Sequence, residues 1–187
     1  FKDKIIELGK VYPGNVLKVD SFLNHQVDVI LLGYLADELH KTFKEMGITK
    51  ILTIETSGIM LACLTAQKFE VPMLFAKKAR TSNLSEEVYS APVFSYTHNR
   101  EYTIIVDKNY LSKEDRVLLV DDFLANGCSL RGLWELVQKA GAVAVGAGVA
   151  IEKGFQGGGD MLRDMGLRVE SMAIIESMDK DGILFRN

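Results

Sequence analysis

Five short apolar runs alternate with segments of helical spacing, and this order limits the fold more than any other feature of the sequence. The runs are KILTIE (50–55), VPMLFA (71–76), RVLLVD (116–121), AVAVGAGVAIE (142–152) and RVESMAIIE (168–176). A strand that is apolar throughout needs cover on both faces, and parallel sheets receive that cover from helices. The alternation therefore predicts an α/β fold with a doubly wound, mostly parallel sheet flanked by helices.

The remaining segments predict how this sheet is connected. Helical spacing of apolar residues runs through 26–46, 58–69 and the segment after residue 128, with a short helix over 157–166. Residues 77–90, KKARTSNLSEEVYS, are polar and show no clear period, which predicts a long loop. Two β-rich runs, APVFSYT and EYTIIVD, follow and predict a hairpin. At 187 residues the chain suits a single domain, 1–187.

Charge and composition exclude several classes of protein. The net charge of -3 argues against a nucleic-acid binder with a broad basic surface. The longest apolar stretch contains Asp28 and then Asp37 and Glu38, so we expect no membrane span. Two cysteines, Cys63 and Cys128, provide neither a metal-binding spacing nor a disulfide framework, which indicates a reducing, cytoplasmic compartment.

Polar residues follow three of the predicted strands, at the edge where doubly wound sheets bind ligands. They lie in the segments 55–58, 121–129 and 152–155. The second, DDFLANGCS, runs from a buried strand into a helix N-terminus, which offers unpaired N–H groups to an anion such as phosphate. The alternative is a plain turn at Asn126-Gly127, followed by a helix that Ser129 caps.

The adjacent acids Asp121 and Asp122 favour a particular anion. Two carboxylates suit a phosphate site only when the ligand also brings hydroxyl groups or a cation. A sugar phosphate brings both, because ribose hydroxyls donate to carboxylates and Mg²⁺ offsets negative charge. If the strand continued through both acids, they would point to opposite sides, so we expect a bend there.

Four apolar residues, two acids and a glycine-containing loop that ends in a hydroxyl residue resemble the signature of the type I phosphoribosyltransferases. The resemblance implies that Asp121 and Asp122 are catalytic and hold the ribose hydroxyls of phosphoribosyl pyrophosphate (PRPP). It also implies that the loop cradles the 5′-phosphate and that Mg²⁺ is held mainly by PRPP oxygens rather than by side chains. The loop residues are Ala125, Asn126, Gly127, Cys128 and Ser129.

Three segments, VLKVDSFLNHQ, VDDFLANG and AIEKGFQ, resemble the bacterial xanthine branch of that family. The resemblance implies a base pocket with Leu17, Asn24 and Lys153, under a small hood formed by residues 1–25 and the C-terminal end. Phe155 is placed to stack on the base. Lysine only donates, which suits a purine carbonyl and not the amine of adenine. The Asn24 amide suits the 2-oxo group or ring N–H of xanthine, but Asn24 as a helix N-cap is an alternative.

The resemblance extends to the leaving-group side of the site. It implies a pyrophosphate loop at Ser57-Gly58, a catalytic Lys78 near the polyphosphate together with Lys77 and Arg80, and a mobile catalytic loop over 77–90. It also implies a homodimer. Many purine transferases carry a carboxylate where this chain has Ala125, so we assign no general base. Two alternatives stay open: preference for guanine or hypoxanthine, and a PRPP-binding transcriptional regulator without turnover.

Overall fold

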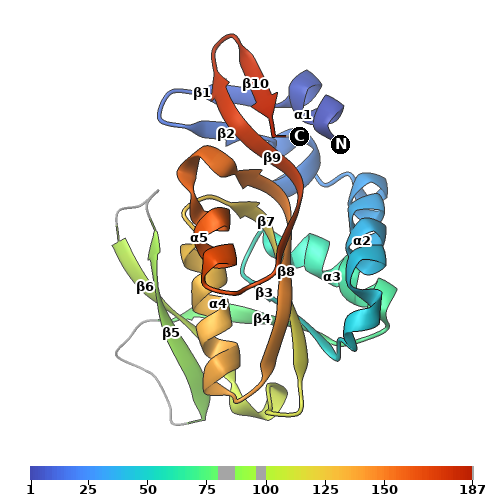
Figure 1. Cartoon of the computed structure of the whole chain (residues 1–187), viewed down its shortest axis with the longest axis vertical. Coiled ribbons are helices and arrows are strands. Elements are labelled where there is room, and N and C mark those ends of the chain that lie inside the picture. Colours follow the sequence, from blue (N-terminus) through green and yellow to red (C-terminus); the bar gives the residue numbers. More distant parts are fainter. Residues whose placement is uncertain (80–86, 96–99, 187) are drawn as a thin grey trace.

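An eight-stranded sheet organises the chain in the computed structural model, which describes residues 1–79, 87–95 and 100–186. The strand order is β10-β9-β8-β7-β3-β4-β6-β5 (Figure 1). Its parallel centre consists of β9 (Val169–Asp179), β8 (Val143–Lys153), β7 (Arg116–Leu124), β3 (Lys50–Ile54) and β4 (Met73–Ala79). Antiparallel strands close both edges: β10 (Gly182–Phe185) on one side, and the hairpin of β6 (Arg100–Asp107) and β5 (Val88–Ser95) on the other. The predicted mostly parallel α/β sheet is confirmed.

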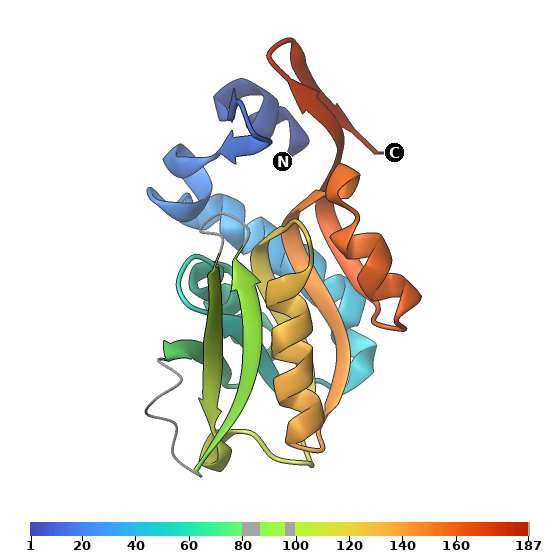
Figure 2. The same ribbon diagram turned by 90° about the vertical axis from the view of Figure 1, so that its left-hand side faces the viewer.

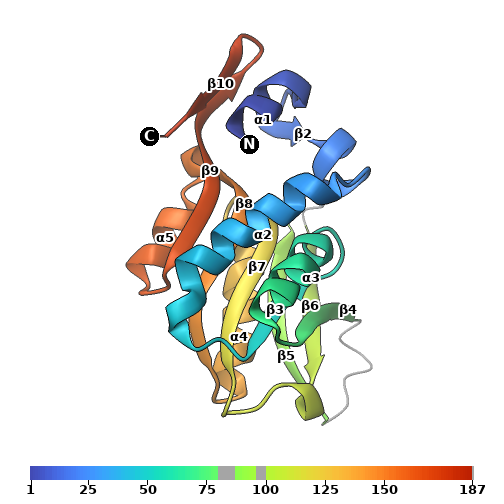
Figure 3. The ribbon, with the colours of Figure 1, turned by 90° about the vertical axis from the view of Figure 1, so that its right-hand side faces the viewer.

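Helices cover both faces of this sheet, as its apolar strands require. Helices α2 (Val29–Phe43) and α3 (Gly58–Phe69) lie on one face, and α4 (Cys128–Lys139) and α5 (Gly158–Asp164) lie on the other (Figures 1 and 3). Side chains of β7 alternate between the two cores: Val117 and Leu119 pack with α4, whereas Leu118 and Val120 pack with α2 and α3. The run that looked uniformly apolar therefore fills two cores at once.

The N-terminal segment forms a separate layer at one end of the molecule, beside the C-terminal hairpin β9–β10 (Figure 2). It contains α1 (Lys2–Leu8), the hairpin of β1 (Lys10–Tyr12) and β2 (Val16–Lys18), and a π-helical turn η1 (Asp20–Asn24). Ile5, Phe22 and Leu23 are almost completely buried in the core that α2 and α3 also use. This packing joins the layer, which we call the hood, to the sheet.

The structure changes several predicted boundaries. The loop expected over 77–90 is wrong at both ends, because β4 continues to Ala79 and β5 begins at Val88. Pairing with β6, Lys77 opposite Ile105, extends β4 through polar residues whose sequence shows no strand period. The interior of the expected loop, including Arg80, lies outside the described residues. Short turns η2 (Lys44–Met46), η4 (Lys108–Tyr110) and η5 (Gly154–Gln156) are also present in the described part of the chain.

None of the described helices combines the length and the apolar character that a membrane crossing requires.

Candidate functional site

The loop after β7 turns directly into α4. Its turn depends on Gly127, which has a φ of 79° in the left-handed region that disfavours other residues. Gly127 is also the N-cap of α4 and provides no side chain to satisfy the first N–H groups of the helix. These N–H groups, in the residues from Cys128 onward, lack partners within the helix and carry the positive end of its dipole. The local conformation is thus that of an anion site.

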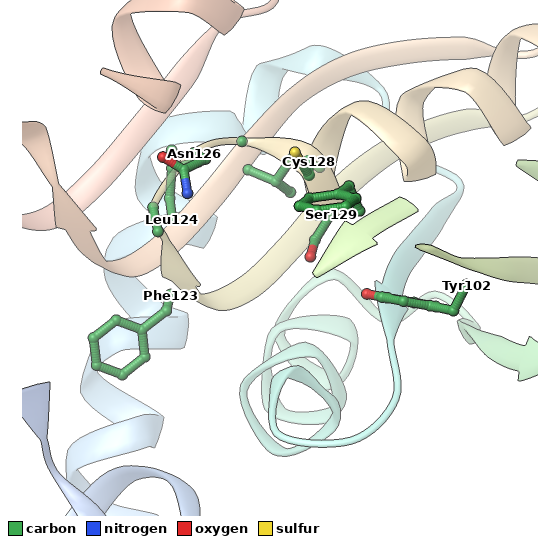
Figure 4. Close-up of a pocket in the computed structure, with 10 residues that line it drawn as sticks. Tyr102, Phe123, Leu124, Asn126, Cys128 and Ser129 are labelled. Atoms are coloured by element: carbon green, nitrogen blue, oxygen red, sulfur yellow. The ribbon is translucent and has the colours of Figure 1, made fainter. Parts of the chain in front are cut away.

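A pocket of about 170 Å³ opens beside this loop. Residues 123–130 form one wall, and Phe94 of β5 and Tyr102 of β6 form the other. The hydroxyl groups of Tyr102 and Ser129 point toward one another, whereas Phe123 points away from the loop (Figure 4). The alternative in which Ser129 caps the helix is wrong, because α4 begins at Cys128 and Ser129 lies within its first turn.

The acids Asp121 and Asp122 are buried although they are adjacent. Strand β7 continues through both to Leu124, so the expected bend at the acids is absent. Only 5% of Asp121 and 6% of Asp122 is exposed. The N–H of Asp122 donates to Oδ1 of Asp121 at 2.9 Å, and the side-chain amide of Asn24 lies 3.4 Å from Oδ2 of Asp122. The hood and α3 therefore cover the two acids. The strand does not bend there, although the sequence had suggested that it would.

The electrostatics of this pair favour a ligand with hydroxyl groups or positive charge. Burial raises the pKa of Asp121 well above its ordinary value, and the negative charge of Asp122 raises it further. The positive charge of Lys78, which lies on β4, lowers the pKa of Asp121 and so opposes this increase. Donors or a cation supplied by a ligand would stabilise the ionised form that burial disfavours. Among the described residues, no group of three or more His, Cys, Asp or Glu side chains is arranged to hold a metal ion.

A second loop, between β3 and α3, approaches the acids from the neighbouring strand. Ser57 is the N-cap of α3 without a side-chain hydrogen bond, and Gly58 is buried at the first helical position. A Cβ atom on Gly58 would lie 2.4 Å from Oγ1 of Thr53 and 2.8 Å from Oδ1 of Asp121. The peptide bond that joins Glu55 to Thr56 is cis. Only glycine allows α3 to begin this close to the acids.

Lys78 lies beside the same loop. Its backbone N–H donates to Oε1 of Glu55 at 2.6 Å, and its ammonium group lies 5.3 Å from the centre of the Tyr102 ring. The antiparallel pairing of β4 with β6 produces this position, which the predicted loop over 77–90 did not anticipate. One cation thus lies between the acids and the pocket.

The hood side of the site contains the residues expected around a base. The ammonium group of Lys153 donates to the carbonyl of Asn15 at 2.8 Å and lies 5.5 Å from the centre of the Phe123 ring. Burial lowers the pKa of Lys153. Leu17 is buried within the hood core, and Phe155 is 37% exposed on η5. Phe123 therefore lies between the acids and Lys153.

Asn24 has an unusual environment. It ends η1, and the N-cap of α2 is Asp28, whose carboxylate accepts from the N–H of Leu31, so the capping alternative for Asn24 is wrong. Its Oδ1 atom is buried and has no hydrogen-bond partner in the described part of the chain. A buried acceptor without a donor is costly, so this oxygen requires a donor from water or from a ligand.

A family model described as the phosphoribosyl transferase domain matches residues 18–162. The chain belongs to this family. Relatives named xanthine phosphoribosyltransferase match over almost the whole length. The protein from Lachnoclostridium phytofermentans is 52% identical over 99% of this chain and 96% of its own, and that from Bifidobacterium animalis subsp. lactis is 55% identical over 96% and 94%.

Solved phosphoribosyltransferase structures share the fold. An adenine phosphoribosyl transferase from Trypanosoma brucei has a TM-score of 0.79 at 20% identity, over 97% of this chain and 82% of its own. An APRTase from Giardia lamblia has a TM-score of 0.77 at 26% identity, over 92% of this chain and 96% of its own. The type I phosphoribosyltransferase fold expected from the sequence is confirmed.

Sequence reasoning missed four residues at this phosphoribosyltransferase site. Phe123 directly follows the paired acids, and that position alone could have drawn attention to it. Tyr102 and Phe94 carry no motif, because only the β5–β6 hairpin brings them to the pocket. Thr53 has a buried hydroxyl without a partner among the residues described. It lies in an apolar run and looked like an ordinary strand residue.

Proposed function

We propose that the protein transfers the 5-phosphoribosyl group of PRPP to xanthine, producing xanthosine 5′-monophosphate and pyrophosphate in purine salvage. The observation that carries this proposal is the environment of Asn24. Its amide NH₂ group lies toward the carboxylate of Asp122, and its buried Oδ1 atom has no partner among the described residues. Family membership supports the phosphoribosyl chemistry, and the full-length relatives support the choice of base.

The contact with Asp122 determines which way the Asn24 amide faces. An ionised carboxylate only accepts hydrogen bonds, so the amide presents its NH₂ group to Asp122 and leaves its oxygen for the ligand. Asn24 could bind either the ring N–H or the 2-oxo group of xanthine. Because its oxygen faces the ligand and only accepts hydrogen bonds, the ring N–H is the better partner. Hypoxanthine lacks the additional ring N–H of xanthine and would leave Oδ1 unpaired.

Lys153 provides the complementary contact. Its ammonium group uses one donor on Asn15 and retains two, which suit a carbonyl oxygen of the base. The amine of adenine would place donor against donor. Phe123 supports the base from the acid side, and Phe155 and Leu17 complete the pocket under the hood.

PRPP occupies the edge of the sheet between the two loops. Asp121 and Asp122 accept from the ribose hydroxyls, and residues 125–129 bind the 5′-phosphate through the N-terminus of α4. Ser57, Gly58 and Lys78 face the pyrophosphate. A purine nitrogen forms the bond to C1′ as the bond from C1′ to pyrophosphate breaks, and the nitrogen loses its proton. Positioning and charge stabilisation account for most of the catalysis.

Mg²⁺ fits this arrangement as an ion bound mainly by PRPP oxygens. The two buried carboxylates are too few to hold it alone, and each has a role toward ribose. When bound, the ion would stabilise the charge that develops on pyrophosphate. Lys78 contributes to the same stabilisation from the side of β4.

Guanine is the second candidate, because the same geometry accommodates it. It shares the 6-oxo group that Lys153 would bind, and its exocyclic amine could donate to Oδ1 of Asn24. The selectivity of the site between xanthine and guanine therefore rests on contacts beyond this amide.

The protein acts as a cytoplasmic homodimer. Both cysteines are free, which suits a reducing compartment. The N-terminal half of α2 exposes Val29, Ile30 and Tyr34, with exposed fractions of 63%, 74% and 66%. A second copy of the chain would remove this apolar surface from water. Light scattering coupled to gel filtration should give twice the chain mass.

Turnover tests the proposal directly. The protein is mixed with PRPP and Mg²⁺ and offered xanthine, guanine, hypoxanthine or adenine separately, and the nucleotides are resolved by chromatography. We expect xanthosine monophosphate to form fastest. A strong preference for guanine would be consistent with the proposed PRPP site but would contradict xanthine as the preferred base. PRPP binding without conversion of any base would favour the alternative that the protein is a PRPP-binding transcriptional regulator without turnover.

A further inference from the structure

Tyr102 belongs to neither of the loops that form the anion site, yet it completes the pocket. It lies on β6, paired with Val93 of β5, more than twenty residues before the phosphate loop along the chain. Its side chain lines the pocket opposite residues 124–130. Its hydroxyl group points toward the hydroxyl group of Ser129 (Figure 4).

The phenol of Tyr102 is a hydrogen-bond donor at neutral pH. Burial raises its pKa above the ordinary value, and the negative charge of Asp121 raises it further. A neutral phenol can donate one hydrogen bond, and the Ser129 oxygen that it faces can accept it. The hydroxyl proton of Ser129 then remains for an anion in the pocket. Hydrogen bonds in such a chain strengthen one another.

The ring of Tyr102 has a second contact. The ammonium group of Lys78 lies 5.3 Å from the ring centre, which is within the range of a cation–π interaction. The backbone N–H of Lys78 donates to Glu55, which precedes Ser57 and Gly58 in the loop between β3 and α3. One side chain therefore touches a group from each of the two anion-binding regions.

We propose that Tyr102 positions PRPP by two separate contacts, its hydroxyl orienting Ser129 toward the 5′-phosphate and its ring holding Lys78 toward the pyrophosphate. This inference rests on the proposed function, because it takes PRPP as the ligand. Tyr102 acts through Ser129 and Lys78 and is a positioning residue. The paired strands β5 and β6 thereby set the distance between the two charged ends that the site accepts.

The two contacts can be separated by substitution. Tyr102→Phe removes the hydroxyl and keeps the ring, whereas Tyr102→Leu removes both. Tyr89→Phe is the matched control. Tyr89 lies on the same hairpin, packs against the same core and carries the ammonium group of Lys108 5.6 Å from its ring centre, but it does not line the pocket.

The test measures binding of ribose 5-phosphate and of pyrophosphate separately by calorimetry, each with Mg²⁺, and the KM for PRPP. For Tyr102→Phe we expect weaker ribose 5-phosphate binding and a higher KM for PRPP, each by about 5- to 10-fold. Its pyrophosphate binding should stay within about twofold of the wild type. Tyr102→Leu should weaken both ligands, and Tyr89→Phe neither.

Four outcomes would overturn the inference. The first is wild-type affinity of Tyr102→Phe for ribose 5-phosphate, and the second is an equal loss for both ligands, which a structural role would produce. The third is additivity with Ser129→Ala, because residues that act through one another should show non-additive effects. Failure of the wild type to bind either ligand would instead overturn the proposed function together with this inference. Normal turnover of xanthine by Tyr102→Phe at low PRPP would overturn only the inference.

Discussion

The side-chain amide of Asn24 lies 3.4 Å from the carboxylate of Asp122, a residue 98 positions later in the chain. This contact joins the hood to the central strand of the sheet. It also joins the residue proposed to read the base to one of the two acids proposed to bind ribose. The amide oxygen that remains is buried and has no hydrogen-bond partner among the described residues.

Asn24→Ala should reduce kcat/KM for xanthine by about 10- to 100-fold, because it removes one buried hydrogen bond to the base. The loss for hypoxanthine should be smaller, since that base lacks the additional N–H. Steady-state rates with both bases measure the difference. Gln26→Ala is the control, because Gln26 is exposed and its side chain donates to the Ser21 carbonyl, away from the acids. Equal losses with the two bases would contradict the role of Asn24 in base choice.

Asp121→Asn should stabilise the protein without ligand by about 1–2 kcal/mol at neutral pH and weaken PRPP binding at least about 10-fold. Burial raises the pKa of Asp121 in the folded state above the unfolded value of about 3.9. Ionisation therefore costs the folded wild type stability as pH rises from about 4 through the folded pKa.

Denaturant unfolding of wild type and Asp121→Asn at several pH values checks this sign. The difference in unfolding free energy should be small below about pH 4, grow as the pH rises and then level off. A difference that shrinks with rising pH would show that the folded state favours the ionised carboxylate.

Gly58→Ala should abolish most of the activity, because the added Cβ would meet the Thr53 hydroxyl at 2.4 Å and Asp121 Oδ1 at 2.8 Å. The start of α3 would have to move away from the acids. The matched control is Gly33→Ala in α2, where a Cβ meets nothing within 4 Å. Alanine there should stabilise the helix by up to about 1 kcal/mol and leave turnover unchanged. Normal PRPP affinity in Gly58→Ala would contradict the close approach.

Arg163→Ala should destabilise the fold by about 3 kcal/mol, because it leaves the carboxylate of Glu152 buried without its positively charged partner, with the Ser171 hydroxyl still donating to it. Glu152 is fully buried, and its two oxygens accept from Arg163 at 3.0 and 2.7 Å. Chemical denaturation measures the loss. The exposed pair of Lys41 and Glu38 is the control, and Lys41→Ala should leave the free energy of unfolding nearly unchanged. A second change, Glu152→Gln, should recover part of the loss in Arg163→Ala.

The sequence by itself determined the class of the sheet, its helical cover and the position of the loop between β7 and α4, which it predicts to bind phosphate. These features are local, because a strand that is apolar throughout requires two cores, and a left-handed glycine before a helix produces an anion site from consecutive residues. The type I fold and its family were readable from VDDFLANGCS for the same reason. The predicted boundaries of strands were wrong where pairing with a distant strand decides them. An example is the end of β4, where the partners of Lys77 and Ala79 lie on β6.

Only the tertiary structure decided how the site closes. Asn24 and Asp122, Lys78 and Tyr102, and Lys153 and Phe123 are brought together by packing between segments that are distant in sequence. No periodicity records such contacts, since each residue alone has an ordinary explanation as a turn, strand or surface residue. The burial of two adjacent acids depends likewise on the hood and on α3, because solvent access is a property of the folded chain.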